Sequence, residues 1–318
     1  MCSMNVVALA GGVGAGKFLR GLVRVVDPGD VTVVVNTGDD MTLHGLHISP
    51  DVDSVMYWLA GLGDRERGWG RGDESFRALE EVRRLGGEAW FGLGDLDLAT
   101  HLVRTQLLQE GRTLTEAVAR LAQGFGLGVA LLPMSDEPVA TMIHAVDEAG
   151  QGLYMHFQVY WVQRGARDEV KVVRYEGADA APPAPGILEA LSEADAILFC
   201  PSNPVASIAP ILAIEPIAQA VGARRERAAG VSPIVAGAPL RGMADRLMPA
   251  AGLEVSAFGA AAAYGGLLTG WVIDERDRDL APRIQSELGV TVAVTDTIMA
   301  DDEAAARLAR SALDVVAG

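Results

Sequence analysis

Short apolar runs alternate along the chain with longer segments in which apolar residues recur every three or four positions. The first pattern is typical of buried strands and the second of amphipathic helices. At both ends of the chain this alternation predicts a parallel sheet with helices on both faces. The predicted strands are Val6–Ala10, Val31–Val35, Glu88–Phe91, Val129–Leu132, Thr141–Val146, Val170–Tyr175, Ala196–Phe199, Ile234–Ala236 and Val292–Val294.

Three segments show the helical pattern most clearly. DVDSVMYWLA places four apolar side chains on one face, and DDEAAARLARSALDVV closes the chain as an amphipathic helix. RTLTEAVARLAQGFG begins with a capping box, Thr113 with Glu116 three residues later, and should end at Gly124.

The middle of the chain differs from the two ends. Consecutive strands, or a strand and a helix, follow one another from Val139 to Tyr175, and APPAPG marks a loop at Ala181–Gly186. We therefore expect residues 1–318 to form a single Rossmann-like α/β domain with a doubly wound, mostly parallel sheet. Residues 139–186 are expected to form a central insertion, an inserted subdomain or lid.

Composition narrows the class of protein. The formal net charge of −16 argues against general binding to nucleic acid, which needs a basic face. No apolar run reaches the roughly 18 residues of a membrane span. The two cysteines form neither a CxxC pair nor a disulfide framework, so a cytoplasmic location is expected. An acidic chain that binds a polyphosphate needs amide N–H groups, a few basic side chains and a divalent cation at the site.

The first strand runs into GGVGAGKF, a glycine turn typical of phosphate sites. The glycines give G-x-G-x-G, and the second strand is followed by Asn36 instead of an acid, which weakens a dinucleotide fingerprint. Phe18 stands where a Walker A loop has the hydroxyl that ligates magnesium. Two interpretations remain. Either amides, a helix starting near Lys17 and the Lys17 charge hold a diphosphate, or the turn is tight and binds nothing.

The segment after the second strand, VVVNTGDDMTLHGLHISPDVD, is rich in aspartate. In a doubly wound sheet it meets the glycine turn at the edge where ligands bind. Four carboxylates beside a diphosphate predict a cation, and magnesium is favoured because it takes oxygen ligands. His44 and His47 suggest zinc, but no third nitrogen or sulfur ligand is in sight. Turn and cap chemistry is the alternative, and it explains Asp51 best.

EAWFGLGDLDLATHLVRTQLL is predicted to run from a strand into a helix. Its core-facing residues are expected to be Leu98, Leu102 and Val103. The adjoining stripe consists of Asp97, His101 and Arg104, which form either a solvated salt-bridge face or part of a site. Asp95, in the turn itself, is a candidate acceptor for a base or ribose, and Ser202 and Asn203 follow a strand where a loop can hydrogen-bond a nucleotide.

Taken together, these segments resemble the 2-phospho-L-lactate transferase family of deazaflavin coenzyme F-420 biosynthesis. The likeness spans nearly the whole chain and rests on ALAGGVGAGKFLRGL, VVNTGDD, HGLHISPDVDSVMYWLAG, GWGRGDESF, WFGLGDLDLATHLVRTQ, LLPMSDEPVAT, CPSNPVASIAPIL and PIVAGAPLRGMADRLM. The resemblance implies transfer of a phosphorylated three-carbon acid, phospholactyl or phosphoenolpyruvyl, from a guanosine diphosphate conjugate to the deazaflavin alcohol Fo. GMP is released, and Mg²⁺ is present.

The resemblance also assigns roles to residues. The diphosphate would be cradled by Gly12, Gly14 and Lys17, although the family often has Arg in place of Lys17, so a point charge replaces a fork. With the loop residues above, the nucleotide site comprises Gly12, Val13, Gly14, Lys17, Asn36, Asp95, Ser202 and Asn203. Fo would lie against Asp40, Thr42 and His44, and the metal would be held by Asp39 and Asp53.

In the expected reaction the ribityl hydroxyl of Fo attacks the phosphorus that bears the acid. Asp40 takes the hydroxyl proton, and Lys17, the metal and amides stabilise the phosphoryl charge. A related group of non-catalytic nucleotide-sugar-binding regulators shares the glycine turn and paired aspartates, but the continuation HGLHISPDVD favours the enzyme. A kinase or NTPase is a third class. Ala257–Gly270 is expected in the core or at a homodimer contact.

Overall fold

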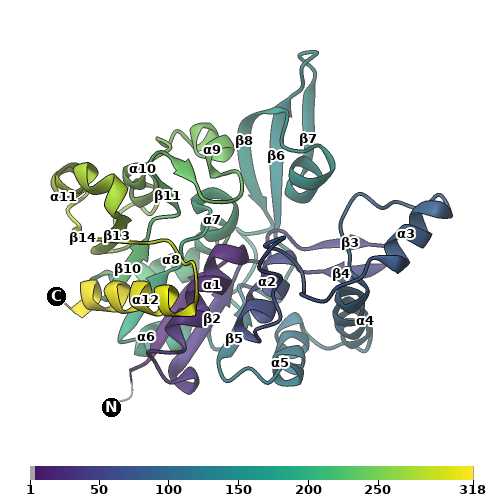
Figure 1. Ribbon diagram of the computed structural model, residues 1–318, viewed down its shortest axis with the longest axis horizontal. Coiled ribbons are helices and arrows are strands. Elements are labelled where there is room, and N and C mark those ends of the chain that lie inside the picture. Colours follow the sequence, from purple (N-terminus) through teal and green to yellow (C-terminus); the bar gives the residue numbers. More distant parts are fainter. Residues whose placement is uncertain (1–3, 318) are drawn as a thin grey trace.

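The computed structural model describes residues 4–317, and a seven-stranded parallel sheet forms its centre (Figure 1). The strand order is β14-β13-β10-β9-β1-β2-β5. Their bounds are β1 (Val6–Ala10), β2 (Val31–Val35), β5 (Ala130–Pro133), β9 (Ala196–Phe199), β10 (Ala228–Val231), β13 (Gly270–Asp274) and β14 (Thr291–Thr295). The chain adds β2 and β5 on one side of β1 and the remaining strands on the other. The order therefore reverses between β1 and β9, where a doubly wound sheet opens a crevice at the carboxyl ends of its strands.

Side chains of β1 alternate between two hydrophobic cores, as the period of two in a strand requires. Val6 and Ala8 pack with α1 (Gly12–Leu22), α2 (Pro50–Leu59), α5 (Leu114–Gly124) and α12 (Asp302–Ala317). Val7 and Leu9 face the other layer. Its helices are α6 (Ile187–Glu193), α7 (Ala209–Ala213), α8 (Glu215–Gly222), α10 (Ala257–Ala262) and α11 (Ala281–Leu288). Helices thus cover both faces, which confirms the predicted α/β class.

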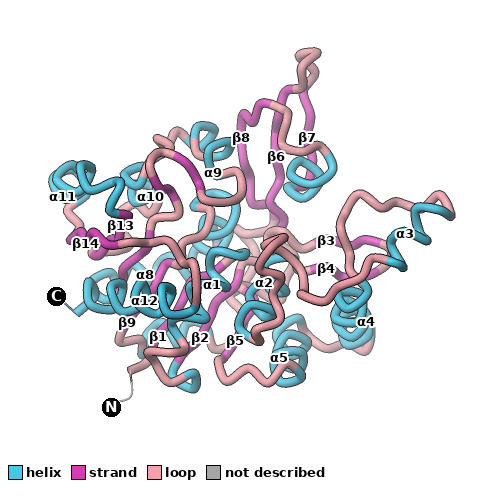
Figure 2. Tube along the Cα trace, viewed as in Figure 1, coloured by secondary structure: helices cyan, strands magenta, loops and turns pink. Residues whose placement is uncertain are grey.

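Three smaller sheets accompany the central one. The largest is antiparallel, with β6 (Ala140–Val146) between β7 (Gly152–His156) and β8 (Glu169–Glu176), and it projects from the body of the molecule (Figures 1 and 2). The others are the hairpins β3 (Met41–Leu43)–β4 (Leu46–Ile48) and β11 (Ile234–Val235)–β12 (Ala238–Pro239). The remaining helices are α3 (Arg77–Arg84), α4 (Asp95–Gln109) and α9 (Ala244–Leu247). Short 3-10 or π turns lie at Pro28–Asp30, Val159–Gln163, Pro204–Ile208, Arg225–Arg227, Pro249–Ala251 and Glu275–Leu280.

Several predicted elements are confirmed and others are wrong. The bounds of β1, β2 and β9 are those predicted, and the capping box of α5 forms between Thr113 and Glu116. Glu88–Phe91 is not a strand, and Ile234–Ala236 contributes only the short β11, outside the central sheet. Strands β10 and β13 were missed because small residues interrupt their apolar runs. Gly230 leaves room for the Trp271 ring of the neighbouring strand, and Gly270 for Val315 of α12.

The segment 257–270 is part of the core. Ala257, Ala260, Tyr264 and Leu268 are all buried in the core that includes α6 to α8. The core interpretation of this apolar segment is therefore confirmed, and the homodimer stays a prediction.

Within residues 4–317, no individual helix has both the length and the apolar character needed to cross a membrane. One sharply bent pair, Pro204–Ala213 with Glu215–Gly222, meets these criteria of length and composition when its two parts are counted together.

Candidate active site

The candidate site lies where the strand order reverses, at the carboxyl ends of β1, β2 and β9. Three loops meet there. The Ser202 hydroxyl, after β9, donates to the Gly11 carbonyl oxygen at 2.9 Å and accepts from the Gly11 amide at 3.4 Å. Asn36, directly after β2, accepts a hydrogen bond from the Gly38 amide at 2.8 Å and donates one to the carbonyl oxygen of Ala206 at 3.2 Å. These hydrogen bonds hold the three loops together. Ser202 and Asn36 therefore already have hydrogen-bond partners within the protein.

The helix after the glycine turn begins at Gly12, not near Lys17 as predicted. Three of the turn's glycines therefore belong to α1, and packing explains the two that follow its first residue. A Cβ on Gly14 would overlap the carbonyl oxygen of Pro201, and one on Gly16 would overlap the Trp58 side chain. No side chain among the described residues caps the first turn, so the amides of Gly12, Val13 and Gly14 form the open positive end of an 11-residue helix.

A buried pair of carboxylates stands in front of this helix end. The Asn36 amide donates to Asp51 at 2.8 Å and to Asp39 at 3.3 Å, and Gln158, just after β7, donates to the other oxygen of Asp39 at 2.9 Å. A Cβ on Gly11 would lie 2.5 Å from Asp51 Oδ2. Asp51 is therefore a member of the site, whereas the sequence pattern alone favours helix capping as its role.

Burial and mutual repulsion change the acidity of this pair. Desolvation raises the pKa of Asp39 well above its usual range, and the neighbouring charges of Asp51 and Asp40 raise it further. Burial raises the pKa of Asp51 to about 7, and Asp40 again adds to the effect. Two crowded, desolvated carboxylates are stabilised in their charged form by a cation held between them.

Magnesium fits Asp39 and Asp51 better than it fits Asp53. Asp53 is also buried, but both of its oxygens contact the guanidinium of Arg104, one of them at 3.1 Å. No group of three or more His, Cys, Asp or Glu side chains within residues 4–317 is placed to hold a metal. Two carboxylates suffice for magnesium, which completes its shell with water and phosphate oxygens.

The acidity of Asp51 predicts a pH dependence of stability. Its pKa is about 7 in the folded chain against 3.8 ordinarily, so between these pH values the folded state binds more protons than the unfolded state. Without metal, the free energy of unfolding should fall as pH rises from about 4 to about 7, and Asp51→Asn should flatten this slope. Magnesium should raise Tm more at about pH 8 than at about pH 5.5. Thermal scans of both proteins with and without Mg²⁺ measure this, and an equal Mg²⁺ shift at both pH values would contradict it.

Asp40 occupies the start of the β3–β4 hairpin. Its Oδ2 lies 3.0 Å from His47 Nε2 and also accepts from the Ser49 hydroxyl, whereas its buried Oδ1 has no hydrogen-bond partner among the described residues. Burial raises the pKa of Asp40, against the opposing effect of His47. One oxygen is thus held in place while the other remains able to accept a proton. Thr42 and His44 lie further along the hairpin and are exposed.

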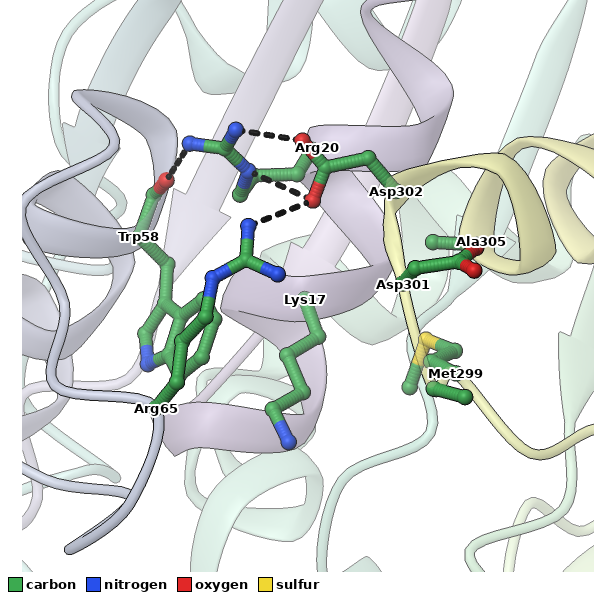
Figure 3. Close-up of a pocket in the computed structure, with 9 residues that line it drawn as sticks. Lys17, Arg20, Trp58, Arg65, Met299, Asp301, Asp302 and Ala305 are labelled. Carbon is green, nitrogen blue, oxygen red and sulfur yellow. Dashed lines mark hydrogen bonds and ion pairs between the residues drawn. The ribbon is translucent and has the colours of Figure 1, made fainter.

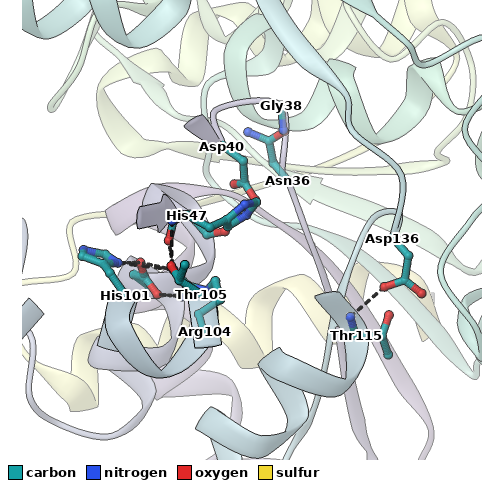
Figure 4. Close-up of polar contacts among 11 residues, drawn as sticks. Asn36, Gly38, Asp40, His47, His101, Arg104, Thr105, Thr115 and Asp136 are labelled. Atoms are coloured by element: carbon teal, nitrogen blue, oxygen red, sulfur yellow. Dashed lines mark hydrogen bonds and ion pairs between the residues drawn. The ribbon is translucent and has the colours of Figure 1, made fainter. Parts of the chain in front are cut away.

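Helix α4 supports this hairpin with its polar side. The expectation that Leu102 and Val103 face the core is wrong, because both are exposed. The buried side consists of Asp97, Thr100, His101, Arg104 and Thr105. Arg104 donates to the carbonyl oxygen of His47 at 3.3 Å, and the Thr105 hydroxyl accepts the His47 amide at 2.8 Å (Figure 4). The polar stripe therefore positions the residue that holds Asp40.

Two other predicted nucleotide contacts also have partners within the protein. Asp95 accepts from the Ser75 hydroxyl and from the Ala78 amide in the first turn of α3. Asn203 accepts the amides of Val205 and Ala206. Both residues lie in loops expected at the site, and their contacts with a nucleotide stay predictions.

A cationic pocket lies beside α1 and was not predicted as a unit. It encloses about 80 Å³ between Lys17, Arg20, Trp58, Arg65 and the start of α12 (Figure 3). Lys17 is partly buried, with Nζ 5.1 Å from the centre of the Trp58 ring. Burial, followed by the charges of Arg241 and Arg65, lowers the pKa of Lys17. In the sequence, Arg65 lies shortly before GWGRGDESF and Arg241 lies within APLRGMADRLM, and neither motif indicates that the two segments meet.

Comparison with known proteins supplies the context for this site. The family model described as "2-phospho-L-lactate transferase CofD" matches residues 6–312. A phosphoenolpyruvate transferase of Kitasatospora aureofaciens is 47% identical, over 98% of this chain and 97% of its own length. A 2-phospho-L-lactate transferase of Methanosarcina mazei is 38% identical, over 95% of this chain and 97% of its own length. The similarity thus includes every loop of the candidate site.

A solved structure shares the fold at much lower identity. A UPF0052 family member from Bacillus halodurans superposes with a TM-score of 0.64 at 16% identity, covering 98% of this chain and 99% of that one. The doubly wound architecture therefore extends to proteins whose sequences have diverged widely.

Proposed function

Because the chain belongs to the 2-phospho-L-lactate transferase CofD family, we propose that it transfers a phosphorylated three-carbon acid from a guanosine diphosphate conjugate to the ribityl hydroxyl of the deazaflavin Fo. GMP leaves, and the product enters coenzyme F-420 biosynthesis. The names of relatives such as those of K. aureofaciens and Mycolicibacterium smegmatis favour phosphoenolpyruvyl over phospholactyl as the transferred group. The observation that supports this proposal best is the buried Asp39–Asp51 pair in front of the uncapped N-terminus of α1.

The donor's diphosphate binds at the first turn of α1. Amides of Gly12, Val13 and Gly14 point to the helix end, where the helix dipole favours anions. Asp51 stands beside Gly11, so its negative charge must be neutralised before a diphosphate can approach. Asp39 and Asp51 would hold a magnesium ion for this purpose, and Asn36 and Gln158 orient the two carboxylates. The ion, when bound, neutralises charge on the phosphate oxygens.

The acceptor approaches from the β3–β4 hairpin, with Thr42 and His44 beside it. Asp40 Oδ1 accepts the proton of the attacking hydroxyl, while His47 and Ser49 hold Oδ2. A raised pKa makes Asp40 a stronger base than an exposed aspartate. The new O–P bond forms at the phosphorus bearing the three-carbon acid, and the bond from that phosphorus to GMP breaks. Lys17 stabilises charge on the phosphoryl oxygens.

Ligand titration and turnover test this function. The protein with Mg²⁺ should bind GDP more tightly than a UDP-sugar or ATP, and it should form an Fo adduct from a guanylated donor only when Fo is present. Mass spectrometry of the adduct from phosphoenolpyruvyl and phospholactyl donors identifies the preferred acid. Preference for the UDP-sugar without turnover would instead indicate a non-catalytic regulator, and ATP turnover would indicate a kinase or NTPase.

A further inference from the structure

Basic side chains from distant parts of the chain lie in or next to the pocket beside α1: Lys17 and Arg65 line it, and Arg241 contacts the loop that carries Arg65. Lys17 belongs to α1, Arg65 to the loop after α2, and Arg241 to the loop after β12. Lys17 makes no ion pair within residues 4–317, and its ammonium group faces the Trp58 ring. Arg241 donates to the backbone carbonyl oxygens of Arg67 and Glu66, at 2.7 and 3.4 Å, which ties its loop across to the Arg65 loop. Two of the three cations therefore lack a carboxylate partner among the described residues.

The nearby acid does not balance this charge. Asp302 already pairs with Arg20 and with Arg65, the latter at 3.0 Å, and a third contact reaches Arg24 at 3.8 Å. Asp301, which also lines the pocket, accepts the Ala304 amide at the start of α12. Lys17 is partly buried and Arg65 and Arg241 are exposed, so these side chains leave an excess of positive charge around the mouth of the pocket. In a chain of net charge −16, such a local excess is suited to binding an anion.

The pocket lies apart from the Asp39–Asp51 pair, but the two are close enough for one ligand to contact both. Trp58 lies seven residues after Asp51 on α2, about 10 Å along the helix axis at 1.5 Å per residue. Lys17 lies over Trp58, at the edge of the pocket nearest the α1 start. A donor whose diphosphate lies at that start has two ends, an uncharged guanosine and a terminal group, and a negatively charged end matches the basic pocket better than the nucleoside does. In the proposed donor this terminal group is a carboxylate.

We propose that Arg65 and Arg241, together with Lys17 nearby, bind the carboxylate of the transferred three-carbon acid. This assignment rests on the proposed function. A guanidinium matches the planar carboxylate with paired N–H donors, whereas a lysine offers only a point charge. Asp302 and the carbonyl oxygens of residues 66 and 67 hold the two guanidinium groups in position before the ligand arrives. The pair then distinguishes a donor that carries an acid from GDP itself.

Calorimetry with matched ligands tests this assignment. The probes are GDP, a methylene-bridged, non-transferable analogue of the enolpyruvyl conjugate, and the methyl ester of that analogue. We expect the wild-type chain to bind the acid about 10-fold or more tightly than the ester. Arg65→Gln and Arg241→Gln should each weaken the acid about 10-fold, and GDP and the ester about 2-fold or less. Arg24→Gln, just beyond the end of α1, outside the pocket lining and paired with Glu303, is the matched control and should change none of the three.

The other outcomes overturn the assignment. An equal loss of GDP and acid affinity in the arginine variants would place these side chains at the diphosphate. Equal wild-type affinities for acid and ester would refute a carboxylate site without any variant, even if a substitution disturbed the loops. If the wild-type chain bound neither GDP nor either analogue, the proposed function would fall and the carboxylate site with it.

Discussion

Asp51→Asn is expected to lower kcat/KM for formation of the Fo adduct by about 10²- to 10³-fold, the usual cost of losing one charge-stabilising group. Asparagine keeps the size of the side chain and its contact with Asn36, but removes one of two carboxylates available to the cation. Asp39→Asn should give a similar loss, because the same amide holds both acids. Steady-state assays of adduct formation with saturating donor and varied Fo, repeated at several Mg²⁺ concentrations, measure the effect.

Asp53→Asn is the informative comparison, since the family resemblance assigns the metal to Asp39 and Asp53. With both Asp53 oxygens on Arg104, its substitution should lower stability and leave Mg²⁺ affinity within about 2-fold. Calorimetric titration with Mg²⁺ in the presence of GDP separates the two effects. A large loss of Mg²⁺ affinity in Asp53→Asn, with retention in Asp51→Asn, would show that Arg104 releases Asp53 to the metal and would refute the Asp39–Asp51 pair.

The choice between Asp51 and Asp53 shows where sequence reasoning stops. Residues two apart on a helix do not face each other, so only one of them can look into a given site. Both are acidic and both lie in the first turn of α2, and the sequence does not state which way the helix is turned. Packing of α2 against α1 decides it, by placing Asp51 against Gly11 and Asp53 toward α4.

Short-range sequence patterns predicted the elements whose formation depends mainly on neighbouring residues. The buried strands β1, β2 and β9, the capping box at Thr113 and the loops at the strand ends all follow from short-range patterns. Contacts that join distant segments left no such signal. Gln158 reaches Asp39 from 119 residues away, and Arg241 reaches the carbonyl of Arg67 from 174 residues away. These long-range partners come from loops whose positions only the assembled sheet determines.

The predicted core-facing side of helix α4 is wrong for a related reason. Its leucines and valine suggested a core-facing side, but a buried charge pairs more favourably with another charge than with an apolar side chain. Asp53 of α2 lies against this helix, Asp97 is buried in its first turn, and Arg104 is fully buried between the helix and its neighbours. The buried polar side leaves Leu102 and Val103 in solvent.

Arg104→Met is expected to lower the free energy of unfolding by about 3–5 kcal/mol, the range for breaking a buried ion pair from one side. Methionine fills much of the space but leaves Asp53 buried without its counterion. His101, 3.5 Å from Asp53, does not replace it, because burial lowers the pKa of His101 to about 4 and the ring is neutral at pH 7. Urea denaturation of purified protein measures the loss.

A matched control and a double variant distinguish the ion pair from simple loss of packing. Arg112→Met breaks an exposed pair with Glu116 on α5 and should cost less than about 1 kcal/mol. Arg104→Met combined with Asp53→Leu removes both charges and should recover part of the loss, since no charge is then left unpaired. A single-variant loss no greater than that of Arg112→Met would mean that water reaches Asp53, and that Arg104 does not hold it away from the magnesium pair.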